Sequence, residues 1–246
     1  MKKLVRVLLA GAILLGLSVL FFGVQYEIFH NRKDMVFYLL QDLGFLPLQV
    51  LLVTLVLDKM FQQRQKADRL RKMNMVIGAF FFEIGTPLLG HLLRFDRNPD
   101  NLRQALKLKA DWAPSCFLEA VRQLQQHGFD MNGADEELPS LKVFLASHRE
   151  MVLRLLENPN LLEHESFAEL LLALSHLTDE LAARSELPRE PGTDADHLGN
   201  DLKRAFRLLV FEWVAYIRHL REDYPYILSL VIRTNPFDPQ ARAVLK

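Results

Sequence analysis

Cysteine is nearly absent from this chain of 246 residues, in which Cys116 stands alone. A single thiol excludes an intramolecular disulfide, and it excludes zinc and iron–sulfur sites that need several cysteines. The neighbours Phe117 and Leu118 are apolar, which is typical of a small buried side chain and not of a reactive thiol. A reducing compartment fits this cysteine content.

Motifs that carry catalysis are also missing. The sequence has no phosphate-binding glycine loop, nucleophile elbow or zinc-protease motif. Residues 130–135 resemble a calcium loop, but the glycine stands fourth instead of sixth, so we predict a plain turn. Residues 82–88 resemble the phosphoacceptor box of sensor histidine kinases, but Phe82 stands where the histidine belongs, which excludes phosphotransfer. These absences favour a non-enzymatic protein without a cofactor.

Net charge is zero, because 30 basic side chains balance 30 acidic ones. The balance hides an uneven distribution: residues 1–6 carry +3, residues 58–72 carry +4 and residues 73–246 carry −6. Basic residues beside an apolar run suit anionic lipid headgroups, and no broad basic patch follows that would suit nucleic acid. The candidates for headgroup contacts are Lys59, Arg64, Lys66, Arg69, Arg71 and Lys72.

Two long apolar runs, at residues 7–24 and 35–57, are the strongest signal present. Each is long enough to cross the hydrocarbon layer as a helix, the first only just. The basic start is also typical of a signal peptide, but no A-x-A-like cleavage site follows the first run, so we expect an uncleaved anchor. The linker, roughly residues 25–34, is too short for a domain. Residues 1–57 therefore read as an antiparallel transmembrane hairpin.

The basic residues orient this hairpin. Three precede the first run and six follow the second, whereas the linker carries only Arg32 and Lys33. The positive-inside rule then places both termini in the cytoplasm.

Polar groups in the second run mark a candidate membrane site formed by Gln41, Asp42 and Gln49, with Pro47 between them. An ionisable group in hydrocarbon is costly and commonly functional, although Asp42 could instead reach the outer headgroups or a basic linker residue. Two spans enclose a pore only by oligomerising. In the first run, Ala12, Gly16 and Gly23 form a candidate helix-packing face, directed at the second span or at another protomer.

Residues 58–94 form a transition. The polar, basic part to residue 72 lacks proline and glycine, so we expect it to continue the second helix. Residues 73–93 are apolar enough to be a buried or interfacial helix, a re-entrant element or a third span. Glu83, Pro87 and three glycines argue against the span.

Residues 95–246 read as a cytoplasmic helical domain, because apolar residues recur there with helical spacing. We predict helices near 102–108, 117–126, 141–156, 166–181, 198–220 and 227–232. Ser166 and Glu169 form a capping-box pattern at the start of the fourth. The predicted fold class is all-α, a transmembrane helical hairpin followed by a soluble helical bundle.

Histidines raise the question of a metal site. His176 and Glu180 are four residues apart and share a helix face, and His164 and Glu165 precede them. This spacing can bind a metal, but the group holds no His-Glu-x-x-His motif. We interpret it as a solvated helix face and predict no metal.

Three blocks of the sequence suggest a relationship. They are residues 45–58, residues 73–82, and Tyr224–Tyr226 together with Arg233–Phe237. They resemble blocks of an uncharacterised group of bacterial two-span integral membrane proteins. This resemblance implies a location in the inner membrane and brings no activity with it.

Three functional hypotheses follow. The first is a membrane-anchored helical interaction or regulatory module that binds protein partners or itself. The second is a subunit of an oligomeric ion channel or transporter with a polar path along the second span. The third is an enzyme that uses the cluster between His164 and Glu180.

Overall fold

The computed structural model describes residues 2–29, 32–109, 112–162 and 164–244, without the side chains of 2–8, 10, 29, 32, 34, 35, 64–72, 160 and 162. The chain divides into two compact units, residues 1–66 and residues 67–246. This division falls inside the predicted transition segment 58–94, whose later part therefore packs with the helical domain.

The first unit consists of α1 (Lys2–Phe29) and the larger part of α2 (Arg32–Phe80), a single helix that contains Pro47. The prediction that the second helix continues through residues 58–72 is confirmed. The windows Gly11–Ile28 and Val36–Gln63 are long and apolar enough to span a membrane, and none of either window is buried. Side chains such as Leu14, Val19 and Leu52 stay exposed.

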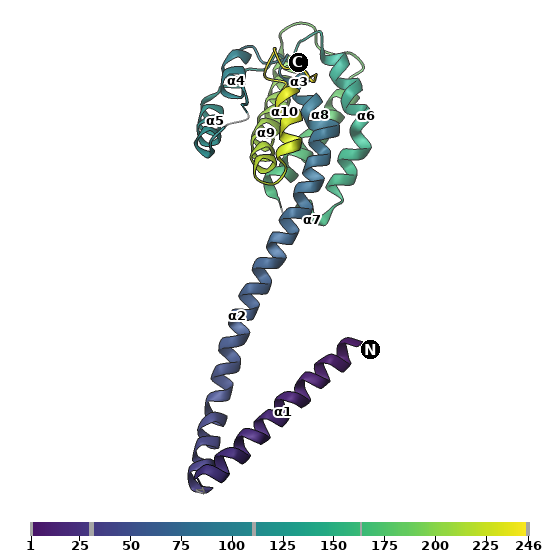
Figure 1. The fold of residues 1–246 in the computed structure, drawn as a ribbon. Helices are drawn as coiled ribbons and strands as arrows, with labels where there is room; N and C mark the ends of the chain where they lie inside the picture. The colour runs from purple at the N-terminus through teal and green to yellow at the C-terminus, as the bar shows by residue number, and fades with distance from the viewer. Residues whose placement is uncertain (1, 30–31, 110–111, 163, 245–246) are drawn as a thin grey trace. The chain divides into compact units, whose positions relative to one another are not determined.

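The second unit is an all-α bundle (Figure 1). After the end of α2 it contains a short π-helical turn and then eight α-helices among the described residues. Their bounds are η1 Phe81–Gly85, α3 Thr86–Leu92, α4 Pro99–Ala105, α5 Pro114–Gln126, α6 Leu138–Leu156, α7 Pro159–Leu162, α8 Glu165–Ala183, α9 Thr193–Asp223 and α10 Pro225–Arg233. Proline stands in the first turn of several of these helices, where its missing N–H costs no hydrogen bond.

The long helix α9 forms the centre of the core. It packs side by side with α8, and α8 packs with α6 on its other flank. Leu202, Phe206, Leu209 and Trp213 recur along α9 at helical spacing and are fully buried. Each predicted helix of this domain is present, and the all-α class is confirmed.

Residues 73–92, the third window apolar enough to span a membrane, are 44% buried within the structure. Phe80 packs edge-to-face on Phe167 of α8, at 5.2 Å between ring centroids, and Phe81 stacks on Tyr216 of α9 at 4.8 Å. These contacts bury one face of residues 73–92 against α8 and α9, as the buried-helix alternative predicts.

The start of α8 differs from the predicted capping box. The helix begins at Glu165 with His164 as its N-cap, and His164 Nδ1 accepts a hydrogen bond from the Phe167 backbone N–H at 3.3 Å. Ser166 lies inside the first turn. The sequence pattern misled because an imidazole nitrogen can accept the same free N–H that serine usually caps.

Two glycines allow the segment before α6 to cross α9 closely. A Cβ at Gly133 would stand 1.9 Å from the Ala195 carbonyl oxygen, and one at Gly199 would stand 3.0 Å from the Met131 oxygen. Nearby, His127 Nε2 lies 2.8 Å from Asp96 Oδ2, and both side chains are buried. The predicted turn at residues 130–135 is confirmed. These contacts fix the segment beside the first turns of α9.

Candidate functional site

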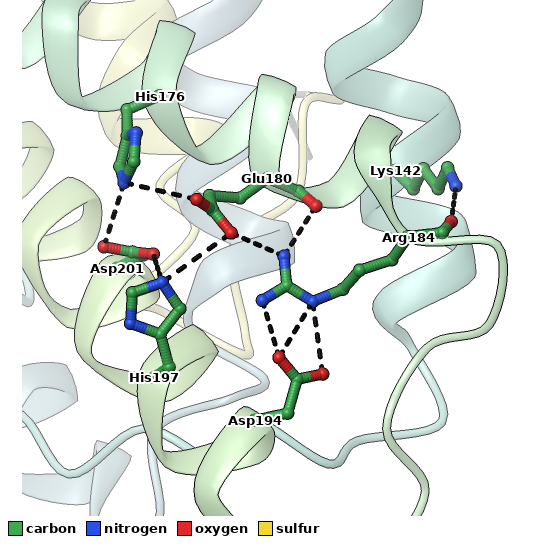
Figure 2. A network of polar contacts seen from close by, with 7 residues as sticks. All are labelled: Lys142, His176, Glu180, Arg184, Asp194, His197 and Asp201. Atoms are coloured by element: carbon green, nitrogen blue, oxygen red, sulfur yellow. Dashed lines mark hydrogen bonds and ion pairs between the residues drawn. The ribbon is translucent and has the colours of Figure 1, made fainter.

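A concentrated polar group in the second unit lies between the last turns of α8 and the first turns of α9 (Figure 2). Each helix contributes a histidine and a carboxylate four residues apart, which places both side chains on the same helix face. On α8 these are His176 and Glu180, and on α9 they are His197 and Asp201. We call these four residues the His–carboxylate cluster.

Both imidazoles of the cluster face both carboxylates. His176 Nε2 lies 3.5 Å from Asp201 Oδ1 and 3.9 Å from Glu180 Oε1. His197 Nε2 lies 3.5 Å from Asp201 Oδ2 and 3.6 Å from Glu180 Oε2. Imidazole and carboxylate groups thus alternate around a small ring that bridges the two helices, and each carboxylate directs one oxygen to each imidazole, as Figure 2 shows.

Asp201 differs from the other three residues by its burial. Its side chain is 5% exposed, whereas those of His176 and His197 are 47% and 55% exposed. Asp201 Oδ2 is buried and has no hydrogen-bond partner, since the His197 contact does not meet hydrogen-bond geometry. A buried carboxylate oxygen without a hydrogen-bond donor is costly, and the nearest basic group to this atom is the His197 imidazole at 3.5 Å.

Arg184 fixes the position of Glu180 from outside the cluster. Its Nη1 donates to Glu180 Oε2 at 2.6 Å, and its Nη2 donates to Asp194 Oδ1 at 2.7 Å. These hydrogen bonds hold the pKa of Glu180 and of Asp194 below the usual carboxyl range, and they raise the pKa of the Arg184 guanidinium. Lys142 Nζ donates to the Arg184 carbonyl oxygen at 2.8 Å, which satisfies a carbonyl at the end of α8.

His164 does not lie near His176 and Glu180, with which the sequence analysis grouped it. His164 caps the start of α8, whereas His176 lies twelve residues further along, which is about 18 Å at helical rise. His176, Glu180 and Asp201 instead present ligand atoms within 4.8 Å of one another. The interpretation of His176 and Glu180 as a solvated helix face is therefore incomplete, because both contact α9.

His197 and Asp201 were missed in the sequence, although a signal for them exists. His176-Leu-Thr-Asp-Glu180 and His197-Leu-Gly-Asn-Asp201 repeat the same spacing of imidazole and carboxylate on consecutive predicted helices. The two pairs form one cluster because the loop at residues 184–192 reverses the chain and packs α9 against α8. The spacing of residues within either helix does not predict this packing.

The membrane candidates belong to the first unit. Gln41, Asp42 and Gln49 are exposed along α2. In the predicted packing face Ala12 is exposed, and a Cβ at Gly16 or Gly23 would meet no atom within 4 Å, so this packing stays a prediction. Of the headgroup candidates Lys59 is exposed, while the side chains of Arg64, Lys66, Arg69, Arg71 and Lys72 lie outside the described residues.

Comparisons with known proteins give a family and no activity. Residues 69–233 match the family model "Uncharacterized protein MJ1433, C-terminal helical domain", and residues 2–61 match "MJ1433, N-terminal helical domain". The uncharacterized protein MJ1433 of Methanocaldococcus jannaschii is 41% identical over 231 residues, which are 94% of this chain and 93% of that protein. No solved structure matches the chain.

These matches bear on the resemblance found in the sequence. An uncharacterised family is confirmed, but the relative is archaeal, and neither a bacterial grouping nor a membrane location follows from its name. The two matched regions meet between residues 61 and 69, which agrees with the structural division after residue 66.

Proposed function

The chain belongs to the family of the uncharacterized protein MJ1433, and within it we propose a membrane-anchored helical module that acts by binding protein partners or further copies of itself. One observation carries the proposal. Both windows of the first unit are long and apolar, and neither is buried at all. In water such surfaces would aggregate, so lipid is the environment that suits them.

The charge distribution supports an orientation for this anchor. Residues 1–6 and 58–72 carry +3 and +4, and they flank the two apolar windows on the side opposite the short linker. Anionic headgroups of the cytoplasmic leaflet attract such flanks. We therefore place both termini, and with them the helical domain of residues 67–246, in the cytoplasm at the inner membrane.

The second unit suits a binding role. It has its own hydrophobic core, and the anchor accounts for its location without any catalytic motif. A domain held at a membrane meets other membrane-bound partners at a high effective concentration, which strengthens weak contacts without new interface area. The proposed activity is recognition of a protein, with the anchor restricting where that recognition occurs.

Cysteine accessibility in spheroplasts tests the orientation. In a Cys116→Ser background, Glu27→Cys places a thiol at the exposed end of α1, and Arg189→Cys places one on the exposed loop between α8 and α9. A membrane-impermeant maleimide should label Glu27→Cys in intact spheroplasts and Arg189→Cys only after permeabilisation. Labelling of Arg189→Cys in intact spheroplasts would place the domain outside and overturn the proposal.

One observation favours a second candidate, a subunit of an oligomeric ion channel or transporter. Gln41, Asp42 and Gln49 are exposed within the apolar window Val36–Gln63. Asp42 and Gln49 are seven residues apart and share nearly the same helix face. In lipid such a face needs a partner helix or a water-filled path. The mass of the full chain in detergent separates the candidates, since four or more copies support the channel and a monomer excludes it.

A further inference from the structure

We propose that His176, Glu180, His197 and Asp201 form a binding site for one divalent transition-metal ion of the Zn²⁺ type. The inference does not depend on the proposed anchoring function. The ion would bind to the His–carboxylate cluster and would link the end of α8 to the start of α9.

The spacing of the ligand atoms is the first argument. Zinc ligands lie about 2.0–2.1 Å from the ion, so neighbouring ligand atoms in a tetrahedral site are separated by about 3.3 Å. In the cluster, ligand atoms of His176, Glu180 and Asp201 all lie within 4.8 Å of one another, and His197 Nε2 lies 3.5 Å from Asp201 Oδ2. Shortening these separations would bring the first three groups to coordination distance, with His197 beside them as the fourth ligand.

The burial of Asp201 is the second and independent argument. Its side chain is 5% exposed, and Oδ2 has no hydrogen-bond partner while it points toward His197. A bound cation at the centre of the cluster would give this oxygen a closer partner than His197 Nε2, which lies 3.5 Å away. Removing a carboxylate from water without a partner is disfavoured, so the arrangement is that of a prepared site and not of incidental surface charges.

Arg184 prepares the remaining carboxylate. Glu180 Oε2 accepts the hydrogen bond from Arg184, while Oε1 faces His176 and keeps its lone pairs for a metal. This outer contact orients the ligand in the way that supporting residues do around known metal sites. The carboxylates of Glu180, Asp194 and Asp201, together with the Arg184 guanidinium, leave a net charge of −2 when both histidines are neutral, which matches a divalent ion.

The ligand types select the class of metal. Two imidazole nitrogens and two carboxylate oxygens suit Zn²⁺ and its first-row neighbours, whereas Mg²⁺ and Ca²⁺ prefer oxygen ligands throughout. The histidine side chains are about half exposed, at 47% and 55%, so the ion has a path from solvent.

Metal binding by the full chain in detergent tests the proposal. The protein is purified without a polyhistidine tag, stripped with EDTA, and titrated with Zn²⁺ in competition with a chromophoric chelator. We expect one Zn²⁺ per chain. His176→Gln, His197→Gln and Asp201→Asn should each weaken binding at least about tenfold, and Co²⁺ should give the absorption of a low-symmetry N/O site that these variants lose.

His219→Gln is the matched control. His219 and Asp223 have the same four-residue spacing on the same helix, at 2.9 Å, but Asn74 is the other polar partner of that imidazole. This variant should retain Zn²⁺ affinity within about twofold. The wild type failing to retain Zn²⁺, or His176→Gln/His197→Gln retaining wild-type affinity, would overturn the proposal. Unchanged far-ultraviolet circular dichroism of the variants shows that lost binding does not reflect unfolding.

Discussion

The imidazole of His176 on α8 lies 3.5 Å, from Nε2 to Oδ1, from the buried carboxylate of Asp201 on α9. This relationship joins two helices that already share the largest helix–helix contact in the bundle. A ligand of the His–carboxylate cluster binds the folded domain, in which α8 and α9 are packed together, and not the unfolded chain. Binding there is therefore coupled to the stability of the domain.

Zinc should raise the melting temperature of the second unit. At a free concentration of about one hundred times Kd, the linkage amounts to about 2.7 kcal/mol, or about 5–10 °C for a domain of this size. Both tryptophans, Trp112 and Trp213, lie in the second unit, so their fluorescence reports its unfolding alone. Asp201→Asn should show a clearly smaller shift, since a tenfold weaker site leaves about 1.4 kcal/mol or less at the same Zn²⁺ concentration. A full zinc-dependent shift in that variant would contradict the assignment.

Arg184 should matter more to the domain than an arginine with a fully exposed pair. Its side chain is 14% exposed and ties α8 to Asp194 of α9, whereas Arg154 and Glu150 pair on one helix with 74% and 79% exposure. We expect Arg184→Gln to lower the urea midpoint clearly and Arg154→Gln to leave it nearly unchanged. Equal midpoints for the two variants would show that the bridge to Asp194 contributes nothing.

The same bridge predicts a dependence on pH. The Arg184 hydrogen bond holds the pKa of Asp194 below the usual carboxyl value, so its contribution to stability is present above that value and is lost as pH falls through the lowered pKa. Urea unfolding measured from neutral pH to about pH 3 should show this loss in the wild type. Arg184→Gln should show a smaller loss, and identical pH profiles would contradict the prediction.

Gly133 should not tolerate a methyl group. A Cβ there would stand 1.9 Å from the Ala195 carbonyl oxygen, and backbone on both sides of this contact must move to relieve it. We expect Gly133→Ala to cost about 2–3 kcal/mol in the free energy of unfolding. Gly90→Ala is the control, since a Cβ at Gly90 in α3 meets nothing within 4 Å and should be neutral or stabilising. A Gly133→Ala protein as stable as the wild type would show that this crossing is loose.

Helices could be predicted from this sequence because their evidence is local. Apolar spacing located α6 and α8 to within three residues and α9 to within five. Contacts between helices could not be predicted, since they depend on the direction in which each loop leads the chain into the next helix. Asp201 illustrates this limit: it follows His197 by one helical turn, but its burial comes from packing against α8.

Some local features were also not predicted, because different residue types can fill the same structural role and one apolar segment can suit two environments. His164 takes the capping position that the pattern assigned to Ser166. Residues 73–92 are apolar enough for a membrane and equally suited to a protein core, and only their contacts with Phe167 and Tyr216 distinguish the two. Hydropathy measures how strongly a side chain prefers an apolar environment to water, and it does not distinguish a lipid bilayer from a protein core.

Asp42 separates the anchor from the channel. If the chain is a simple anchor, Asp42→Asn should leave its membrane insertion unchanged. An uncharged amide lowers the free-energy cost of placing side chain 42 in lipid. As a channel subunit, the chain should lose cation flux in proteoliposomes. Gln49→Leu tests the neighbouring position on the same face, and Lys59→Gln, outside the proposed path, serves as the control.

The placement of the apolar windows Gly11–Ile28 and Val36–Gln63 in lipid is the central claim. Its most direct test is extraction of membranes from expressing cells with alkaline carbonate, followed by flotation in a density gradient. The account predicts that the full chain stays with the floating lipid after extraction and leaves it only in detergent. A full chain that is released by carbonate, or that sediments without lipid, would contradict it.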